Sequence, residues 1–169
     1  GCKTLEDNTD GDNNVAIGVA SLFNNTTAND NTALGSYVLT KNTEGHSNLA
    51  AGANAAGCNT TGDLNTALGF CSLRLNTTAN NNTAVGAKAL AVSTTAADNV
   101  ALGTSAMVAT TTGHSNVSIG KDSMIGNLTG DGNTALGFKA LFTNNGSTPD
   151  FNVAVGRQAL YSTTSGYRN

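Results

Sequence analysis

The sequence predicts an all-β fold, a parallel β-solenoid of about nine to ten coils with one coil per 17 residues. Three observations predict it. A five-residue motif returns at a fixed interval, large and small side chains alternate within the motif, and an Asn/Thr-rich segment separates the copies. A unit of this length has no room for a helix and a crossover, so successive units can only stack as coils.

The motif NTALG occurs at 31–35, 65–69 and 133–137, and related pentapeptides occur at the equivalent place in every other repeat. The first eight copies are 17 residues apart, whereas the last interval is 19, which predicts a loop insertion near 146–150, beside Pro149. We expect residues 1–169 to form a single repeat array with a partial coil at 1–13, as a fragment of a longer chain. The coils start near Asn14, Asn31, Asn48, Asn65, Asn82, Asn99, Asn116, Asn133 and Asn152.

Within a unit we number the leading asparagine as position 0. Position 1 is Val, Thr or Leu and position 3 is Ile, Leu or Val except at Ala51, while position 2 is Ala except at Ser118. Positions 1 to 3 therefore predict a strand with a large face and a small face. We expect the large residues at positions 1, 3 and 8 to supply the apolar core, and another chain to approach the small face at position 2. About three such side chains cannot offset the entropy of ordering a whole coil, so other subunits are expected to contribute.

Position 4 is glycine in every unit and predicts a turn at the end of the strand. A small residue followed by a large one at positions 7 and 8, as in Ser72-Leu73, predicts a second short strand, and the Asn/Thr-rich residues after it predict a polar turn. The leading asparagines are expected to bond through their side-chain amides from coil to coil. The glycine ladder consists of Gly18, Gly35, Gly52, Gly69, Gly86, Gly103, Gly120, Gly137 and Gly156.

Composition and charge exclude several kinds of partner. The chain of 169 residues has a formal net charge of −3 and no basic run, so no nucleic acid is expected. No apolar run is long enough for membrane insertion. The charges are segregated: basic residues recur at positions 5 and 6 and acidic residues at positions 15 and 16. The basic set is Lys3, Lys88, Lys121, Lys139 and Arg157, and the acidic set is Asp12, Asp30, Asp63, Asp98 and Asp131.

No residue pattern predicts catalysis, a cofactor or a metal site, so we expect a non-enzymatic protein. His46 and His114 share position 15 but lie four coils apart; a ring of three histidines around a trimer axis is the alternative to a solvated turn. Asp10 and Asp12, near Glu6 and Asp7, lack a partner base, and calcium-like turns at 9–13 and 129–133 are explained by turn chemistry. The cysteines Cys2, Cys58 and Cys71 are interpreted as small apolar residues rather than as disulfide partners or ligands.

The run N-[TV]-A-[LIV]-G-x-x-[AS]-L resembles the NTAxGxxAL repeats of tail-fibre and related fibre proteins of phages and large viruses. It is also similar to the shorter head repeats of trimeric autotransporter adhesins. The resemblance implies a left-handed β-roll, three chains around one axis, and an extracellular fibre for adhesion and host attachment. The implied partners are two further copies of the chain, in a homotrimer, and a host cell-surface glycan or protein.

Two further sets of residues bear on function. A threonine ladder at position 12 makes an ice-binding β-solenoid the alternative function; it consists of Thr9, Thr26, Thr43, Thr60, Thr77, Thr94 and Thr111. The outward positions 5, 6, 9 and 10 are expected to carry any recognition. Their candidate residues are Phe70, Arg74, Lys88, Lys139, Phe142 and Tyr161. Sequons in the polar turns, such as Asn59-Thr60-Thr61, are attributed to composition.

Overall fold

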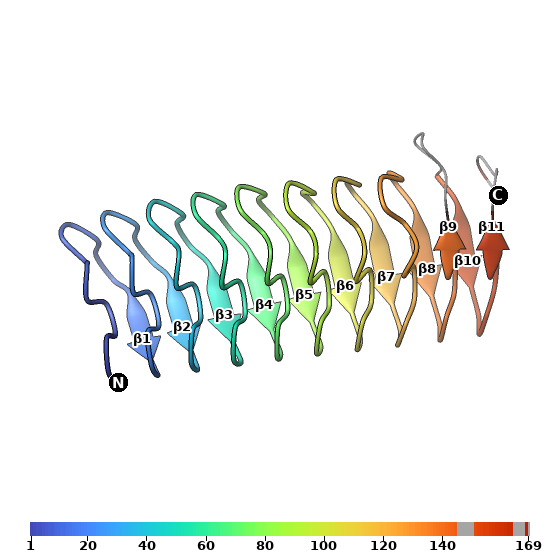
Figure 1. Cartoon of the computed structure of the whole chain (residues 1–169). Coiled ribbons are helices and arrows are strands. Elements are labelled where there is room, and N and C mark those ends of the chain that lie inside the picture. Colours follow the sequence, from blue (N-terminus) through green and yellow to red (C-terminus); the bar gives the residue numbers. More distant parts are fainter. Residues whose placement is uncertain (145–150, 164–167, 169) are drawn as a thin grey trace.

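The chain forms a parallel β-solenoid in the computed structural model, which describes residues 1–144, 151–163 and 168. Nine short strands, one per coil, form a parallel sheet in the order β1-β2-β3-β4-β5-β6-β7-β8-β10 along a straight rod (Figure 1). These are β1 (Val15–Ile17), β2 (Thr32–Leu34), β3 (Leu49–Ala51), β4 (Thr66–Leu68), β5 (Thr83–Val85), β6 (Val100–Leu102), β7 (Val117–Ile119), β8 (Thr134–Leu136) and β10 (Val153–Val155). In a second parallel sheet, β9 (Thr143–Asn144) pairs with β11 (Ser162–Thr163). The predicted solenoid fold is confirmed, and the described residues contain no helix.

Like residues lie over like residues along the rod. Leu34 pairs with Ala51 and Ala51 pairs with Leu68, so the two leucines are in register two coils apart. The longer interval between β8 and β10 leaves this register unchanged, because Val153 pairs with Thr134. The predicted loop insertion at 146–150 lies outside the described residues. Each repeat unit, including the longer one, therefore corresponds to one coil.

The interior of the coil is lined by the small face of the strand, contrary to expectation. The alanines at position 2, such as Ala33, Ala67 and Ala101, are fully buried, whereas positions 1 and 3 point outward. Ile17 is 63% exposed and Val15 48% exposed. The prediction that positions 1 and 3 supply the core was wrong, and so was the prediction that another chain approaches position 2. The cross-section is already occupied by the side chain of position 8, which is leucine or methionine in most coils, by the residue of position 7 and, in most coils, by two asparagines.

The predicted second strand at positions 7 and 8 is also wrong. Backbone φ is positive at positions 6 and 8, for example 55° at Cys71 and 49° at Leu73. A strand would point adjacent side chains to opposite faces, but here Ser72 and Leu73 are both fully buried. Hydrogen bonding between coils continues in this segment, since the Leu73 amide donates to the Ala89 carbonyl at 2.9 Å. The large side chain of position 8 thus reaches the core without an extended backbone.

The glycine of position 4 forms the corner after each strand. Gly69 has a φ of +134°, a conformation that L-residues with side chains rarely adopt. A Cβ atom built on it would also lie 2.7 Å from the carbonyl carbon and oxygen of Gly86 in the next coil. Backbone angle and close stacking therefore both require glycine at this corner.

We predict that Gly69→Ala lowers the free energy of unfolding by more than about 2 kcal/mol, from backbone strain and the clash with the next coil. Thermal unfolding followed by circular dichroism measures the effect. Gly57→Ala is the matched control, because position 9 carries a side chain in other coils, such as Arg74, and a Cβ atom on Gly57 would meet only a milder contact, 3.2 Å from the Tyr37 carbonyl oxygen. An equal loss of stability in both variants would contradict this account of the corner.

Candidate functional site

The leading asparagines form a continuous hydrogen-bonded ladder inside the rod. The backbone amide of each asparagine from Asn31 to Asn152 donates to the Oδ1 of the asparagine one coil earlier, at 2.9–3.0 Å. The Nδ2 group donates to the carbonyl at position 14 of the same unit, as Asn48 does to Gly62 at 2.8 Å. Both halves of each amide are thus used, and each ladder bond joins two coils.

A second asparagine ladder at position 11 was missed by the sequence analysis, which assigned these residues to a polar turn. Nδ2 of Asn59 donates to Oδ1 of Asn42 at 2.7 Å, and Nδ2 of Asn76 donates to Oδ1 of Asn59 at 2.6 Å. All three side chains are fully buried. Asn59 also donates to the Gly62 carbonyl, so two asparagine amides converge on this one acceptor. The return of Asn at the 17-residue period was the signal that could have revealed this ladder.

The position 11 ladder has one gap. Ser93 and Thr110 replace asparagine in two successive coils, and Oδ1 of Asn76 is buried with no hydrogen-bond partner. Ser93 turns its hydroxyl to the Ala96 carbonyl at 3.5 Å, and Thr110 donates to the Asn127 carbonyl at 2.7 Å. The gap leaves the Asn76 acceptor desolvated without compensation.

The threonines of position 12 are engaged in bonds along the rod. The Oγ1 of each donates to the main-chain carbonyl of position 12 in the next coil, at 2.9–3.4 Å, from Thr9 through Thr111. The ladder lies in a turn rather than on a strand, and most of its members are half-buried. Their hydroxyl hydrogens are therefore directed to protein carbonyls and not to solvent.

Both histidines serve as hydrogen-bond acceptors in the turn at position 15. Nδ1 of His46 accepts from the Asn29 amide at 2.9 Å, and Nδ1 of His114 accepts from the Ala97 amide at 3.0 Å. The His46 amide in turn donates to Asp63 Oδ1 at 2.7 Å. The two histidines remain four coils apart. Among the residues that the structure describes, no three His, Cys, Asp or Glu side chains are grouped to hold a metal ion.

The remaining acidic and thiol candidates are dispersed. Glu6, Asp7, Asp10 and Asp12 are exposed in the first coil. Cys2, Cys58 and Cys71 are free thiols.

The outward side of the nine-stranded sheet is a mainly apolar surface with four threonines, which we call the outer sheet face. It consists of positions 1 and 3 of every strand and carries no charged residue. Its members are Val15, Ile17, Thr32, Leu34, Leu49, Ala51, Thr66, Leu68, Thr83, Val85, Val100, Leu102, Val117, Ile119, Thr134, Leu136, Val153 and Val155. Soluble monomers rarely expose an apolar patch that runs the length of the molecule.

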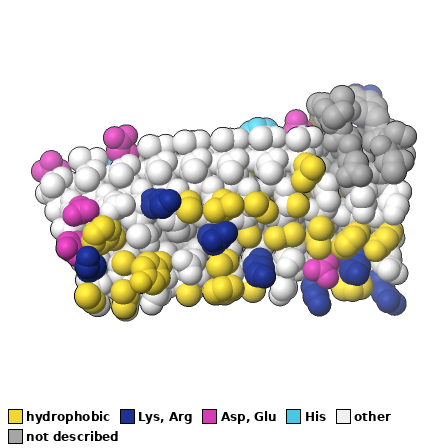
Figure 2. All heavy atoms as spheres, viewed as in Figure 1, with side chains coloured by type: hydrophobic (Ala, Val, Ile, Leu, Met, Phe, Trp, Pro, Cys, Tyr) yellow, Lys and Arg dark blue, Asp and Glu magenta, His cyan; other side chains and the backbone are white. Residues whose placement is uncertain are grey.

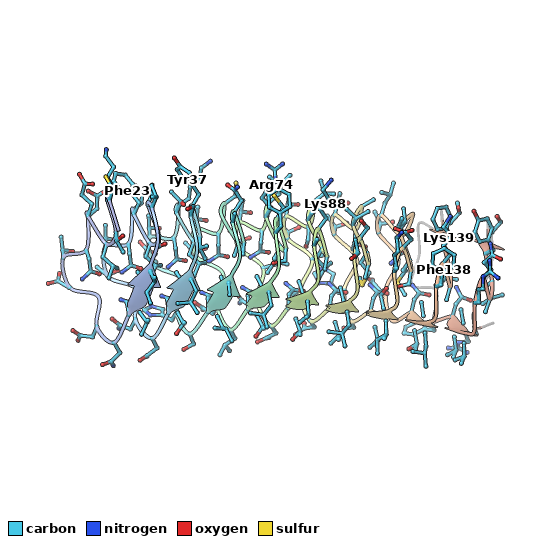
Figure 3. The ribbon with its side chains drawn as sticks, turned by 90° about the horizontal axis from the view of Figure 1, so that it is seen from below. Phe23, Tyr37, Arg74, Lys88, Phe138 and Lys139 are labelled. Carbon is cyan, nitrogen blue, oxygen red and sulfur yellow. The ribbon has the colours of Figure 1, made fainter. Side chains whose placement is uncertain are left out.

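The residues expected to carry recognition lie on a different side of the rod. Two of them, Arg74 and Lys88, follow Phe23 and Tyr37, which were not predicted, along the side opposite the sheet (Figure 3). Hydrophobic and basic side chains also run the length of the face shown in Figure 2.

Two groups form on this side. Phe70, Arg74 and Lys88 border one hollow. Farther along, Phe142 stacks on Tyr161 with ring centroids 4.9 Å apart, and Lys139 Nζ lies 5.0 Å from the Phe142 centroid.

We predict that the double variant Ser93→Asn/Thr110→Asn is more stable than the native chain by about 1–3 kcal/mol, because it completes the ladder and gives Asn76 Oδ1 a donor. An asparagine at position 11 is compatible with an alanine at position 14, as in the coil of Ser93 and Ala96, because Nδ2 of Asn76 already donates to the Ala79 carbonyl in this way. Chemical unfolding measures the difference. The single variant Ser93→Asn is the control, since it only transfers the unpaired acceptor to residue 93; a double variant no more stable than the native chain would contradict the prediction.

Comparisons of the chain with models of protein families, with curated proteins and with solved structures found no match. In the part of the chain that the structure describes, no helix has the length and apolarity needed to cross a bilayer.

Proposed function

We propose that the chain is a non-enzymatic structural segment of an extended surface or virion fibre that serves attachment to a host or a neighbouring cell. The observation that carries the proposal is the combination of a uniform rod with an apolar outer sheet face along its whole length. Internal bonding makes the rod continuous from coil to coil, so its length scales with the number of repeats. The resemblance to fibre and adhesin repeats supports the extracellular setting.

The outer sheet face supports a homotrimer as the functional unit. Burial of the valine, isoleucine and leucine side chains against other copies would remove their apolar surface from water, and every coil would contribute at least one such side chain. The threonines and the single alanine on the face introduce no charge that would oppose burial. The fibre resemblance supports three chains. In this arrangement the three sheets face the axis, and the opposite sides of the rods remain outside.

We predict that the protein sediments at about 51 kDa, three times the chain mass of 16.9 kDa, at micromolar concentration. The double variant Leu68→Asp/Leu102→Asp places two carboxylates on the outer sheet face, and their burial in the trimer would be strongly unfavourable. It is therefore expected to sediment at the mass of one chain. Sedimentation velocity measures both masses.

The matched control is Leu64→Asp. Leu68 and Leu102 are half-buried, whereas Leu64 is an exposed leucine at position 16, where other coils carry Asp30 and Asp98 with similar positive φ. This variant should remain trimeric. A native chain that sediments as a monomer, or a Leu64→Asp variant that dissociates as completely as the sheet-face variant, would overturn the assignment of the interface.

The ice-binding alternative receives no support from the threonine ladder. The hydroxyl groups of position 12 donate to carbonyls of the next coil and so do not present a free array of donors to water. We expect no thermal hysteresis at micromolar protein, which nanolitre osmometry measures. A hysteresis gap that Thr60→Val/Thr77→Val abolishes would establish the alternative.

A further inference from the structure

The side of the rod opposite the sheet contains two adjoining hollows that share one arginine. The first, of about 190 Å³, is lined by Tyr37, Lys41, Asn54, Cys58 and Arg74, among others. The second, of about 360 Å³, is lined by Phe70, Arg74 and Lys88 with neighbouring apolar side chains. Arg74 thus forms the wall between them, and each hollow has one aromatic ring and a second cation. The labelled Tyr37, Arg74 and Lys88 follow the rod axis in this order (Figure 3).

The cations of these hollows are not neutralised by the protein. No carboxylate lines either hollow. Lys41, Arg74 and Lys88 are exposed and form no ion pair within the described residues. Five acidic side chains lie instead in the polar turns, at positions 15 and 16. On the same side of the rod as the hollows, Asp7 is two coils from Lys41, Glu6 is four coils from Arg74, and Asp122 is two coils from Lys88. The hollows therefore form a locally positive site on a chain whose net charge is −3.

The aromatic rings of the site are exposed. Tyr37 is 50% exposed and Phe70 is 53% exposed. A flat exposed ring beside a guanidinium group suits a ligand with a flat apolar face and a negative charge on its edge. Pyranose rings that carry carboxylate or sulfate groups have this character, and a guanidinium binds either anion with two parallel hydrogen bonds.

We propose that this site binds an acidic polysaccharide, with Arg74 as the anchor between two successive sugar subsites. The proposal rests on the attachment function above and names its ligand class. Tyr37 and Phe70 stack on sugar rings, and Lys41 and Lys88 pair with the flanking anionic groups. A nucleic acid fits less well, because its charges are dense and the site offers only three cations over several coils. The site faces outward in the trimer, where three copies around the rod increase avidity.

The experiment measures binding of the purified chain to immobilised heparin and hyaluronate by biolayer interferometry at physiological salt. Dextran is the uncharged control, and polyglutamate and single-stranded DNA are the other polyanions. We expect binding to heparin or hyaluronate and not to dextran. Arg74→Ala should weaken it by about tenfold or more, and Arg74→Lys should restore binding only in part.

Lys121→Ala is the matched control, since Lys121 is an exposed cation outside both hollows, and it should change the affinity by less than about twofold. Equal binding by Arg74→Ala and the native chain would overturn the site, as would tighter binding to polyglutamate or DNA than to the polysaccharides. The oligomeric mass of each sample separates the two proposals. A trimer that binds no polysaccharide overturns the site alone, and a monomer with Arg74-dependent binding overturns the trimer alone.

Discussion

The structure depends on the burial of two asparagine amides in nearly every coil. Such amides are destabilising in an apolar interior unless each donor and acceptor is paired. In this rod Oδ1 of Asn48 accepts from the backbone amide of Asn65 in the next coil, and Nδ2 of Asn59 donates to Oδ1 of Asn42 in the previous coil. Nδ2 of Asn48 donates to the Gly62 carbonyl of its own unit. A slip of one residue would break the ladder bonds between coils and would turn the alanines of the strand outward. The amide ladders therefore specify the register as well as contributing to stability.

The same constraint determines the shape of the molecule. In most coils two asparagines, the alanine of the strand, the residue of position 7 and one leucine or methionine fill the cross-section, so the larger residues of the strand, such as Leu68 and Val85, lie outside. A composition poor in aromatics and rich in Asn, Thr and Gly is then sufficient for an ordered rod, because backbone and amide hydrogen bonds between coils replace a wide apolar core. The apolar residues left outside form the outer sheet face, which favours association with further copies.

The sequence alone predicted the repeat, the stacking of like residues and the glycine corner, because these follow from the period and from chemistry local to one position. It did not predict which face of the strand is internal, since the alternation of Ala67 and Leu68 is the same in either case. The left-handed residues at positions 6 and 8 gave no signal, as Cys71 and Leu73 are not typical of such conformations. Arg74 and Lys88 were predicted to point outward. Tyr37 was missed because it lies at another position of the repeat, two coils before Arg74, and only the structure places the two residues at one hollow.

Hydrogen exchange of the asparagine side chains, followed by NMR, tests the central claim most directly. Nδ2 of Asn48 and Asn59 is bonded inside the rod, whereas Asn81 is an exposed asparagine whose Nδ2 bonds only Asp98 at the surface. The account predicts that the side-chain amides of both ladders exchange about a hundredfold or more slowly than that of Asn81, with the same protection in each central coil. Exchange at one common rate for ladder and surface asparagines would contradict it.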